Sequence, residues 1–187
     1  MVYIVTEQFF NGKVSDNSTN MRTDLVWINA LDATHINYES MIEPNTIVEM
    51  MKDTVIFIVS KNRPEYLSYI KNYKGRKFII QEGSKTLWLD WPVRYQLIYL
   101  EILKNVNGIL CHNTLDQSYF KSLTDNKVPV EILPTIHYTD KFKDKRVGKY
   151  KNSIIIGGNM NSWYGGMHSY LAIKDYDFDR IGITTMG

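Results

Sequence analysis

Short apolar runs alternate along this chain with longer stretches of helical pattern, and this alternation limits the possible folds more than any other feature. The runs are continuous rather than alternately apolar and polar, which is typical of strands covered by helices on both faces. Strands and helices in this order favour a mostly parallel sheet with right-handed crossovers. The strands that we predict in the first part of the chain are Val2–Val5, His35–Tyr38, Val55–Val59, Phe78–Ile80, Gly108–Cys111 and Val130–Leu133.

Helical patterns between these runs supply the crossovers. The segment Pro92–Val106 begins with a proline at an early helical position and carries apolar residues on more than one face, so we expect it to be heavily buried. Another helix, Thr114–Leu123, opens with Thr114 and Gln117 at the spacing of a capping box. The whole pattern predicts an α/β, Rossmann-like, doubly wound domain. The other helices that we predict are Pro64–Tyr73, with Asn62 as its N-cap, and Ser18–Leu31.

The pattern stops at Pro134 and begins again after a basic stretch. Residues 140–152 hold six basic and two acidic residues in a short polar segment, which is typical of a solvated linker. After it we predict strands over Ser153–Ile156 and Arg180–Thr184, with a helix over Ser162–Lys174 between them.

Two strands and one helix do not close a domain. We therefore predict a Rossmann-like N-terminal domain over residues 1–139, a basic linker over 140–152, and over 153–187 the first βαβ unit of a second Rossmann-like domain, which is incomplete. The alternative is a single domain in which the later strands extend the first sheet.

Composition excludes several classes of protein. Hydrophobic residues make up 44% of the 187 residues and charged residues 22%, which is typical of a globular chain and not of a disordered one. The longest apolar run, Val55–Val59, is too short to cross a membrane, and the N-terminus lacks the pattern of a signal peptide. The single cysteine, Cys111, rules out an internal disulfide framework and fits a reducing compartment, so we expect a cytoplasmic protein.

The segments that follow the strands are the places to look for a site, because ligands of open α/β sheets bind beyond the carboxyl ends of the strands. Glu82 follows the fourth predicted strand, His112 and Asn113 follow the fifth, and His137 follows the sixth. Because parallel strands end at the same edge, we expect these residues to line one cleft. Turn-forming roles are the alternative for Glu82 and Asn113. The histidines show no metal-ligand spacing, so we predict no metal site.

Aromatic and thiol side chains near these positions have two interpretations each. Trp88 and Trp91 present faces of the kind that stack on sugars, and the alternative is that they pack the face between the two domains. Cys111 precedes a histidine and an asparagine, but a thiol nucleophile needs its partners to converge in space rather than to be adjacent in sequence. We therefore expect Cys111 to be a small buried residue.

A glycine-rich turn stands between the strand and the helix of the second predicted domain. Glycines there allow a backbone to approach a phosphate, and the start of the following helix offers free N–H groups. The turn lacks the Lys-Ser/Thr ending of a P-loop, and the segment after the first strand lacks a G-x-G-x-x-G fingerprint, so neither an NTPase nor an NAD or FAD cofactor is predicted. A plain tight turn is the alternative. The residues that we predict to bind a ligand there are Gly157, Gly158, Asn159, Gly165 and Gly166.

Three stretches together resemble a known family. They are FIIQEG at 78–83, NGILCHNTLDQSYFKSL at 107–123 running into VEILPTI, and SIIIGGNMNSWYGG at 153–166. Their order is similar to the N-terminal half of a two-domain glycosyltransferase of the GT-B fold, especially the retaining, glycogen-synthase-like group and its phage relatives.

The resemblance implies transfer of a sugar from a nucleotide-sugar donor, which is a substrate rather than a cofactor, to an acceptor in the cleft between the domains. The acceptor is a saccharide, a protein or modified DNA. The resemblance places Glu82, His112, Asn113 and His137 on the acceptor side and the glycine-rich turn at the donor diphosphate.

The chain departs from this family in two ways, so we expect it to be inactive alone. The family places an arginine and a lysine near the start of the second domain, whereas the first base after the turn here is Lys174. The acidic donor-binding motif of the family is absent up to Gly187. The alternative function is a non-catalytic Rossmann-like module that binds a nucleotide or a protein, with the segment Trp88–Tyr99 as its interface.

Overall fold

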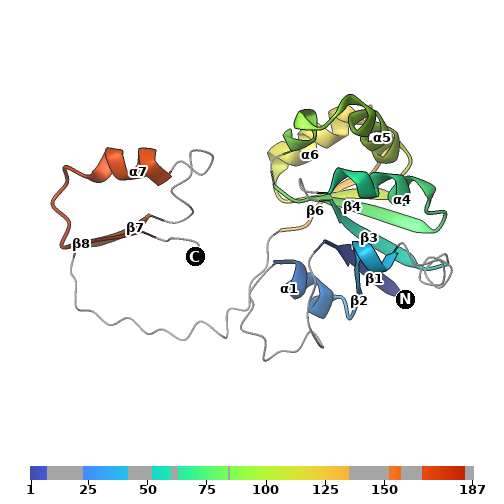
Figure 1. The fold of residues 1–187 in the computed structure, drawn as a ribbon, viewed down its shortest axis with the longest axis horizontal. Coiled ribbons are helices and arrows are strands. Elements are labelled where there is room, and N and C mark those ends of the chain that lie inside the picture. The colour runs from blue at the N-terminus through green and yellow to red at the C-terminus, as the bar shows by residue number, and fades with distance from the viewer. Residues whose placement is uncertain are drawn as a thin grey trace. The chain divides into compact units, whose positions relative to one another are not determined.

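The computed structural model describes residues 1–7, 23–41, 52–59, 63–83, 85–134, 152–156 and 166–183. The chain divides into two compact units, Met1–Lys141 and Phe142–Gly187. The first unit contains a six-stranded sheet and the second a two-stranded sheet, as the coloured ribbon in Figure 1 shows.

All six strands of the first unit run parallel. Their order is β2-β1-β3-β4-β5-β6, so the chain leaves β1 toward one edge of the sheet and then returns to its other side. This confirms the mostly parallel α/β sheet that the continuous apolar runs predict. The strands are β1 Val2–Thr6, β2 Thr34–Asn37, β3 Thr54–Val59, β4 Arg76–Gln81, β5 Gly108–Cys111 and β6 Val130–Ile132.

Helices cover both faces of this sheet. They are α1 Thr23–Ala30, α2 Tyr38–Met41, α4 Leu67–Asn72, α5 Val93–Lys104 and α6 Thr114–Leu123, with two 3-10 turns, η1 Pro64–Tyr66 and η2 Leu87–Asp90. In Figure 1, α4, α5 and α6 lie on one face and α1 on the other. Successive strand residues point to opposite faces. Val55 and Phe57 therefore join the core beneath α4 and α5, while Ile56 and Ile58 pack with Trp27 of α1.

The first turn of α6 differs from the prediction. Its N-cap is Asn113, whose Oδ1 accepts a hydrogen bond from the backbone N–H of Asp116 at 2.9 Å, and Thr114 is already the first helical residue. The backbone of Asn113 is extended directly after β5, with φ −155°, which turns its side chain back onto the helix start. The cap therefore lies one residue before the predicted one.

The helix α5 is less buried than its apolar composition predicts. Tyr99, Ile102 and Leu103 are buried, but Val93 is 68% and Leu97 62% exposed. The helix contacts the sheet from one side, so apolar residues on its outer side meet solvent. The helix predicted from Pro64 begins as the 3-10 turn η1 and becomes α-helical at Leu67, and the cap predicted at Asn62 lies outside the described residues.

The second unit is one parallel βαβ element. Its strands are β7 Ser153–Ile156 and β8 Arg180–Ile183, and α7 Gly166–Ile173 lies between them in the chain. The strands pair in parallel from Ser153 opposite Arg180 to Ile156 opposite Ile183. Over the described ranges they pair only with each other, so they are not added strands of the six-stranded sheet.

Candidate functional site

The carboxyl-end edge of the six-stranded sheet contains the topological switch point. The chain turns to opposite sides after β1 and after β3, and in open α/β sheets ligands bind outside the carboxyl ends of strands at such a point. At this edge β1 ends at Thr6, β3 at Val59, β4 at Gln81 and β5 at Cys111.

The end of β1 carries a buried polar contact with β2. The Oγ1 atom of Thr6 lies 3.1 Å from Nε2 of His35, and Thr6 is buried. Burial lowers the pKa of His35 from its ordinary value of 6.5, and the nearby carboxylate of Asp24, at the start of α1, raises it in partial compensation. The neutral imidazole is therefore favoured beside the Thr6 hydroxyl.

The end of β2 is held by side-chain hydrogen bonds to backbone groups. Asn37 Oδ1 accepts from the N–H of Glu39 at 2.7 Å, and Asn37 Nδ2 donates to the carbonyl of Glu7 at 3.3 Å. The next residue, Tyr38, donates its hydroxyl to the carbonyl of Ile58 at 3.0 Å. Burial raises the pKa of the Tyr38 phenol, so it stays protonated and keeps this donor role. These bonds tie the ends of β1, β2 and β3 together.

The end of β4 holds a second buried polar group. The side chain of Gln81 accepts the hydroxyl of Tyr99 at 2.7 Å and donates to the carbonyls of Val59 and Glu82 at 3.3 and 3.0 Å. Glu82 itself is exposed, and its backbone N–H donates to the carbonyl of Val59 at 3.1 Å. Gly83 follows with φ +85°, a conformation that favours glycine and turns the chain away from the sheet.

Three of the four predicted cleft residues, Glu82, His112 and Asn113, lie at the same edge of the sheet. Ile80 of β4 stands opposite Leu110 of β5, so Glu82 and His112 each follow this pair by two residues. The ring of His112 stacks on Trp27 of α1, with centroids 5.7 Å apart and planes 8° from parallel. Its Nδ1 lies 3.4 Å from the carbonyl oxygen of Leu133. His112 therefore also links β5 to α1 and β6.

Asn113 lies at this edge as a helix cap, and the fourth predicted cleft residue, His137, is not described by the structure. Asn113 is exposed but uses both ends of its amide on Asp116, as the cap of α6, with Nδ2 donating to Oδ2 at 2.9 Å. His137 lies outside the described residues. Of the predicted donor turn, Gly157, Gly158, Asn159 and Gly165 also lie outside them, and Gly166 is the first residue of α7.

The tryptophans near Glu82 belong to the core. Trp88 and Trp91 are buried around Tyr99, with ring centroids 5.6 and 5.4 Å from it. The indole N–H of Trp88 donates to the hydroxyl of Tyr119 at 3.2 Å. Their faces are thus used in packing and are not presented to a sugar. The segment from Trp88 to Tyr99 offers solvent the aliphatic side chains of Leu89, Val93 and Leu97 instead.

The thiol of Cys111 is a buried donor. Its Sγ donates to the carbonyls of Glu131 at 3.4 Å and Asn113 at 3.6 Å, and burial raises its pKa. A protonated, buried thiol is a poor nucleophile. In the part of the chain that the structure describes, no group of three or more His, Cys, Asp or Glu side chains is placed to hold a metal ion. No helix within the described ranges has the length and apolar character needed to cross a membrane.

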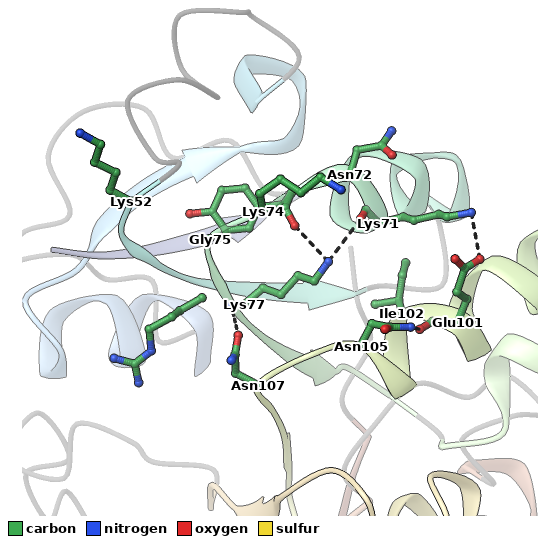
Figure 2. Close-up of a pocket in the computed structure, with 12 residues that line it drawn as sticks. Lys52, Lys71, Asn72, Lys74, Gly75, Lys77, Glu101, Ile102, Asn105 and Asn107 are labelled. Atoms are coloured by element: carbon green, nitrogen blue, oxygen red, sulfur yellow. Dashed lines mark hydrogen bonds and ion pairs between the residues drawn. The ribbon is translucent and has the colours of Figure 1, made fainter.

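A pocket of about 680 Å³ lies at the opposite, amino-end edge of the same sheet. Figure 2 shows the residues around it, which come from the end of α4, the start of β4, the end of α5 and the segments before β3 and β5. Sequence reasoning missed this pocket. A signal was present in the run KNYKGRK at 71–77, where four of seven residues are basic. The lining residues are Lys52, Lys71, Asn72, Tyr73, Lys74, Gly75, Arg76, Lys77, Glu101, Ile102, Asn105 and Asn107.

Comparisons of the chain with protein-family models, curated proteins and solved structures found no match.

Proposed function

We propose that this chain is the acceptor-side part, with the start of the donor-side part, of a glycosyltransferase that uses a nucleotide-sugar donor. The observation that carries the proposal is the succession of two parallel α/β units, a six-stranded sheet followed by a separate β7–α7–β8 element. Two Rossmann-like units in one chain are the architecture that the resemblance to GT-B enzymes implies. The topological switch point of the first sheet supports a ligand site at its carboxyl-end edge.

In this proposal the acceptor binds at the carboxyl-end edge of the first sheet. The exposed carboxylate of Glu82 is suited to accept hydrogen bonds from hydroxyl groups of the acceptor, and His112 adds a ring nitrogen at the same edge. Both are anchored through their neighbours, since Gln81 is fixed by Tyr99 and His112 stacks on Trp27. Positioning of this kind is a large part of what an enzyme supplies in a transfer between two bound substrates.

We assign the donor diphosphate to the glycine-rich segment 157–166, which the sequence predicts to be a turn and which ends at the first residue of α7, Gly166. In the reaction, the bond from the sugar C1 to the diphosphate oxygen breaks, and a new bond forms from C1 to the acceptor hydroxyl oxygen. The electron pair goes to the diphosphate oxygen, and the proton of the hydroxyl passes to the departing diphosphate. Backbone N–H groups of the turn would stabilise the developing negative charge.

A thermal-shift panel of nucleotide sugars tests this proposal, because a ligand that binds only the folded state raises its unfolding midpoint. We expect at least one donor to raise the midpoint of the whole chain. Replacing Gly158 by Val should weaken that donor about tenfold or more, since a charge-assisted hydrogen bond contributes roughly 1.5–3 kcal/mol and a β-branched side chain would block close approach.

Gly182→Val is the matched control in the same unit. A Cβ at Gly182 would meet Cγ1 of Ile155 at 3.5 Å, an ordinary contact, so β8 should tolerate the change. Equal donor affinity in the folded Gly158→Val and Gly182→Val variants would remove the glycine-rich segment from the site, and with it the proposed contact to the donor diphosphate.

A second candidate is a non-catalytic nucleotide- or protein-binding module. The observation that favours it is that Gln81 and Asn113, at the carboxyl-end edge, are already used in hydrogen bonds that hold the fold. Turnover separates the two functions. Because the chain is expected to be inactive alone, this test needs a longer protein in which the donor-side domain is complete: there a transferase releases a nucleoside diphosphate from the bound donor when acceptors are added, whereas a binding module returns the donor intact.

A further inference from the structure

The outer side of α5 carries apolar residues in a continuous row. Val93 and Leu97 are exposed, and Leu100 is partly buried. Because residues at i, i+4 and i+7 lie on the same side of a helix, these three form one stripe along α5, which we call the α5 stripe. Scattered exposed apolar residues are ordinary, whereas a contiguous apolar surface indicates an interaction site.

Packing within the domain does not explain the α5 stripe. The residues of α5 that enter the core are Tyr99, Ile102 and Leu103, and they lie on a different side of the helix. Polar residues at positions 93 and 97 would leave that core unchanged. The apolar character of the outer side therefore has no role in holding α5 to the sheet.

Two residues of opposite charge flank the stripe. Arg94 directly follows Val93, and Glu101 directly follows Leu100, so both lie on the same flank, one toward each end of the helix. If two copies of α5 lie antiparallel, Arg94 of one copy comes beside Glu101 of the other, and two-fold symmetry makes this contact twice. A parallel pair would bring like charges to the same level. The charge pattern is therefore complementary to itself in the antiparallel orientation.

Contacts within the chain restrain both charged side chains at the surface. Nη2 of Arg94 donates to the hydroxyl oxygen of Tyr95 at 2.7 Å, and its guanidinium lies over the Tyr95 ring, with Cζ 4.5 Å from the centroid. Oε2 of Glu101 lies 2.9 Å from Nζ of Lys71. A guanidinium has five N–H donors and a carboxylate has two acceptor oxygens, so each group can bind a second partner. Side chains that are already restrained lose less entropy on association.

We propose that the outer side of α5 is a self-association surface, on which a second copy of this chain packs its own α5 in the antiparallel orientation. The two α5 stripes face each other, and Arg94 of each copy pairs with Glu101 of the other. One short helix offers a small interface, so the dimer is weak and depends on protein concentration. The proposal is independent of the proposed function, since self-association needs neither a donor sugar nor an acceptor.

Sedimentation velocity of the whole chain tests the proposal over a range of about 5 µM to about 500 µM, which covers the affinities of small interfaces. We expect a monomer–dimer equilibrium. Leu97→Glu should weaken the dimer about tenfold or more, because it places a charge at the centre of the apolar contact.

The matched control is Leu115→Glu. Leu115 is also an exposed leucine, 72% exposed, but it lies in the first turn of α6 and outside the α5 stripe. The control should keep at least half of the dimer affinity. Because both leucines are exposed, both variants should fold, and circular dichroism checks this.

Charge reversal tests the orientation. Arg94→Glu puts two acidic side chains at each contact and Glu101→Arg puts two basic ones there, so each variant alone should dimerise about three- to tenfold more weakly. An equal mixture of the two variants pairs opposite charges again at both contacts and should restore the native affinity. The mixture does not restore the pair between Lys71 and residue 101 within a chain, so recovery reports the contact between chains.

A chain that stays monomeric over this concentration range would overturn the proposal and assign the α5 stripe to another segment or to a different protein. Equal dimer affinity in Leu97→Glu and Leu115→Glu would remove the stripe from the interface. A mixture of the charge variants that dimerises no better than either alone would exclude the antiparallel pairing of Arg94 with Glu101. Weakening by Leu97→Glu alone, together with recovery in the mixture, supports the proposal.

Discussion

The polar groups at the two edges of the six-stranded sheet differ in how they are partnered. At the carboxyl-end edge, Gln81 and Asn113 are satisfied by hydrogen bonds to nearby groups, and His112 stacks on Trp27. At the amino-end edge, the ammonium of Lys77 donates to three backbone carbonyls, and other basic residues line a pocket with a single carboxylate. The carboxyl-end edge, where the topology predicts a site, is rich in hydrogen bonds that hold the fold. The amino-end edge, where the topology predicts no site, has more basic than acidic residues around its pocket.

This contrast separates two kinds of evidence for function. The topology indicates the carboxyl-end edge, because strand order reverses there. Charge composition distinguishes the amino-end edge, where five of the residues that line the pocket are basic and one is acidic. The predictions below test whether the structural groups at each edge hold the fold as their contacts indicate.

The largest effect is expected at the amino-end edge, from Lys77→Met. This change removes the cation from three backbone carbonyls, and hydrogen bonds to charged groups contribute about 1.5–3 kcal/mol. We expect the free energy of unfolding, measured by urea denaturation, to fall by about 2–3 kcal/mol. Lys104→Met, an exposed change at the end of α5, should stay within about 0.5 kcal/mol. Similar losses in both variants would show that Lys77 does not cap α4.

A smaller effect is expected at the carboxyl-end edge, from Asn113→Ala. Loss of an N-cap typically costs about 1 kcal/mol, so urea denaturation should show a decrease of that size. Thr114→Ala is the control, because Thr114 stands where the capping-box pattern predicts the cap but is the first residue of α6. Thr114→Ala should lower the free energy of unfolding clearly less than Asn113→Ala does. A larger loss of unfolding free energy in Thr114→Ala than in Asn113→Ala would show that Thr114 is the cap.

The smallest effect is a pH dependence from His35. Its pKa is lowered by burial in the folded state, so the unfolded chain binds the proton more readily. Between the folded pKa and 6.5 the unfolded state holds more protons, and stability therefore rises with pH and is lost on acidification. The slope of unfolding free energy against pH should flatten in His35→Gln.

Asp24→Asn sharpens this test. Without the carboxylate that raises it, the His35 pKa falls further, and the slope should extend to lower pH. A slope that neither substitution alters would mean that His35 does not titrate with unfolding.

The parallel sheet was predictable because its signal is local. Continuous apolar runs such as Val55–Val59 are buried on both faces, and all six strands of the first sheet overlap their predicted ranges, with Gly108–Cys111 identical. Parallel pairing then follows from the crossover helices and brings Glu82 and His112 to one edge. The cap of α6 was misplaced by one residue because Asn113 and Thr114 are both good caps, and only the extended backbone after β5 decides between them.

Hydrophobic periodicity and connection length act over short stretches of chain, so the order of strands and helices, and the edge at which the strands end, can be predicted from the sequence. Which polar groups are already hydrogen-bonded or stacked depends on tertiary packing. Trp27 meets His112 and Tyr99 meets Gln81 across long sequence separations, and the amino-end pocket collects residues from Lys52 to Asn107. Such contacts depend on how helices pack on the sheet, and no local pattern in the chain encodes that packing.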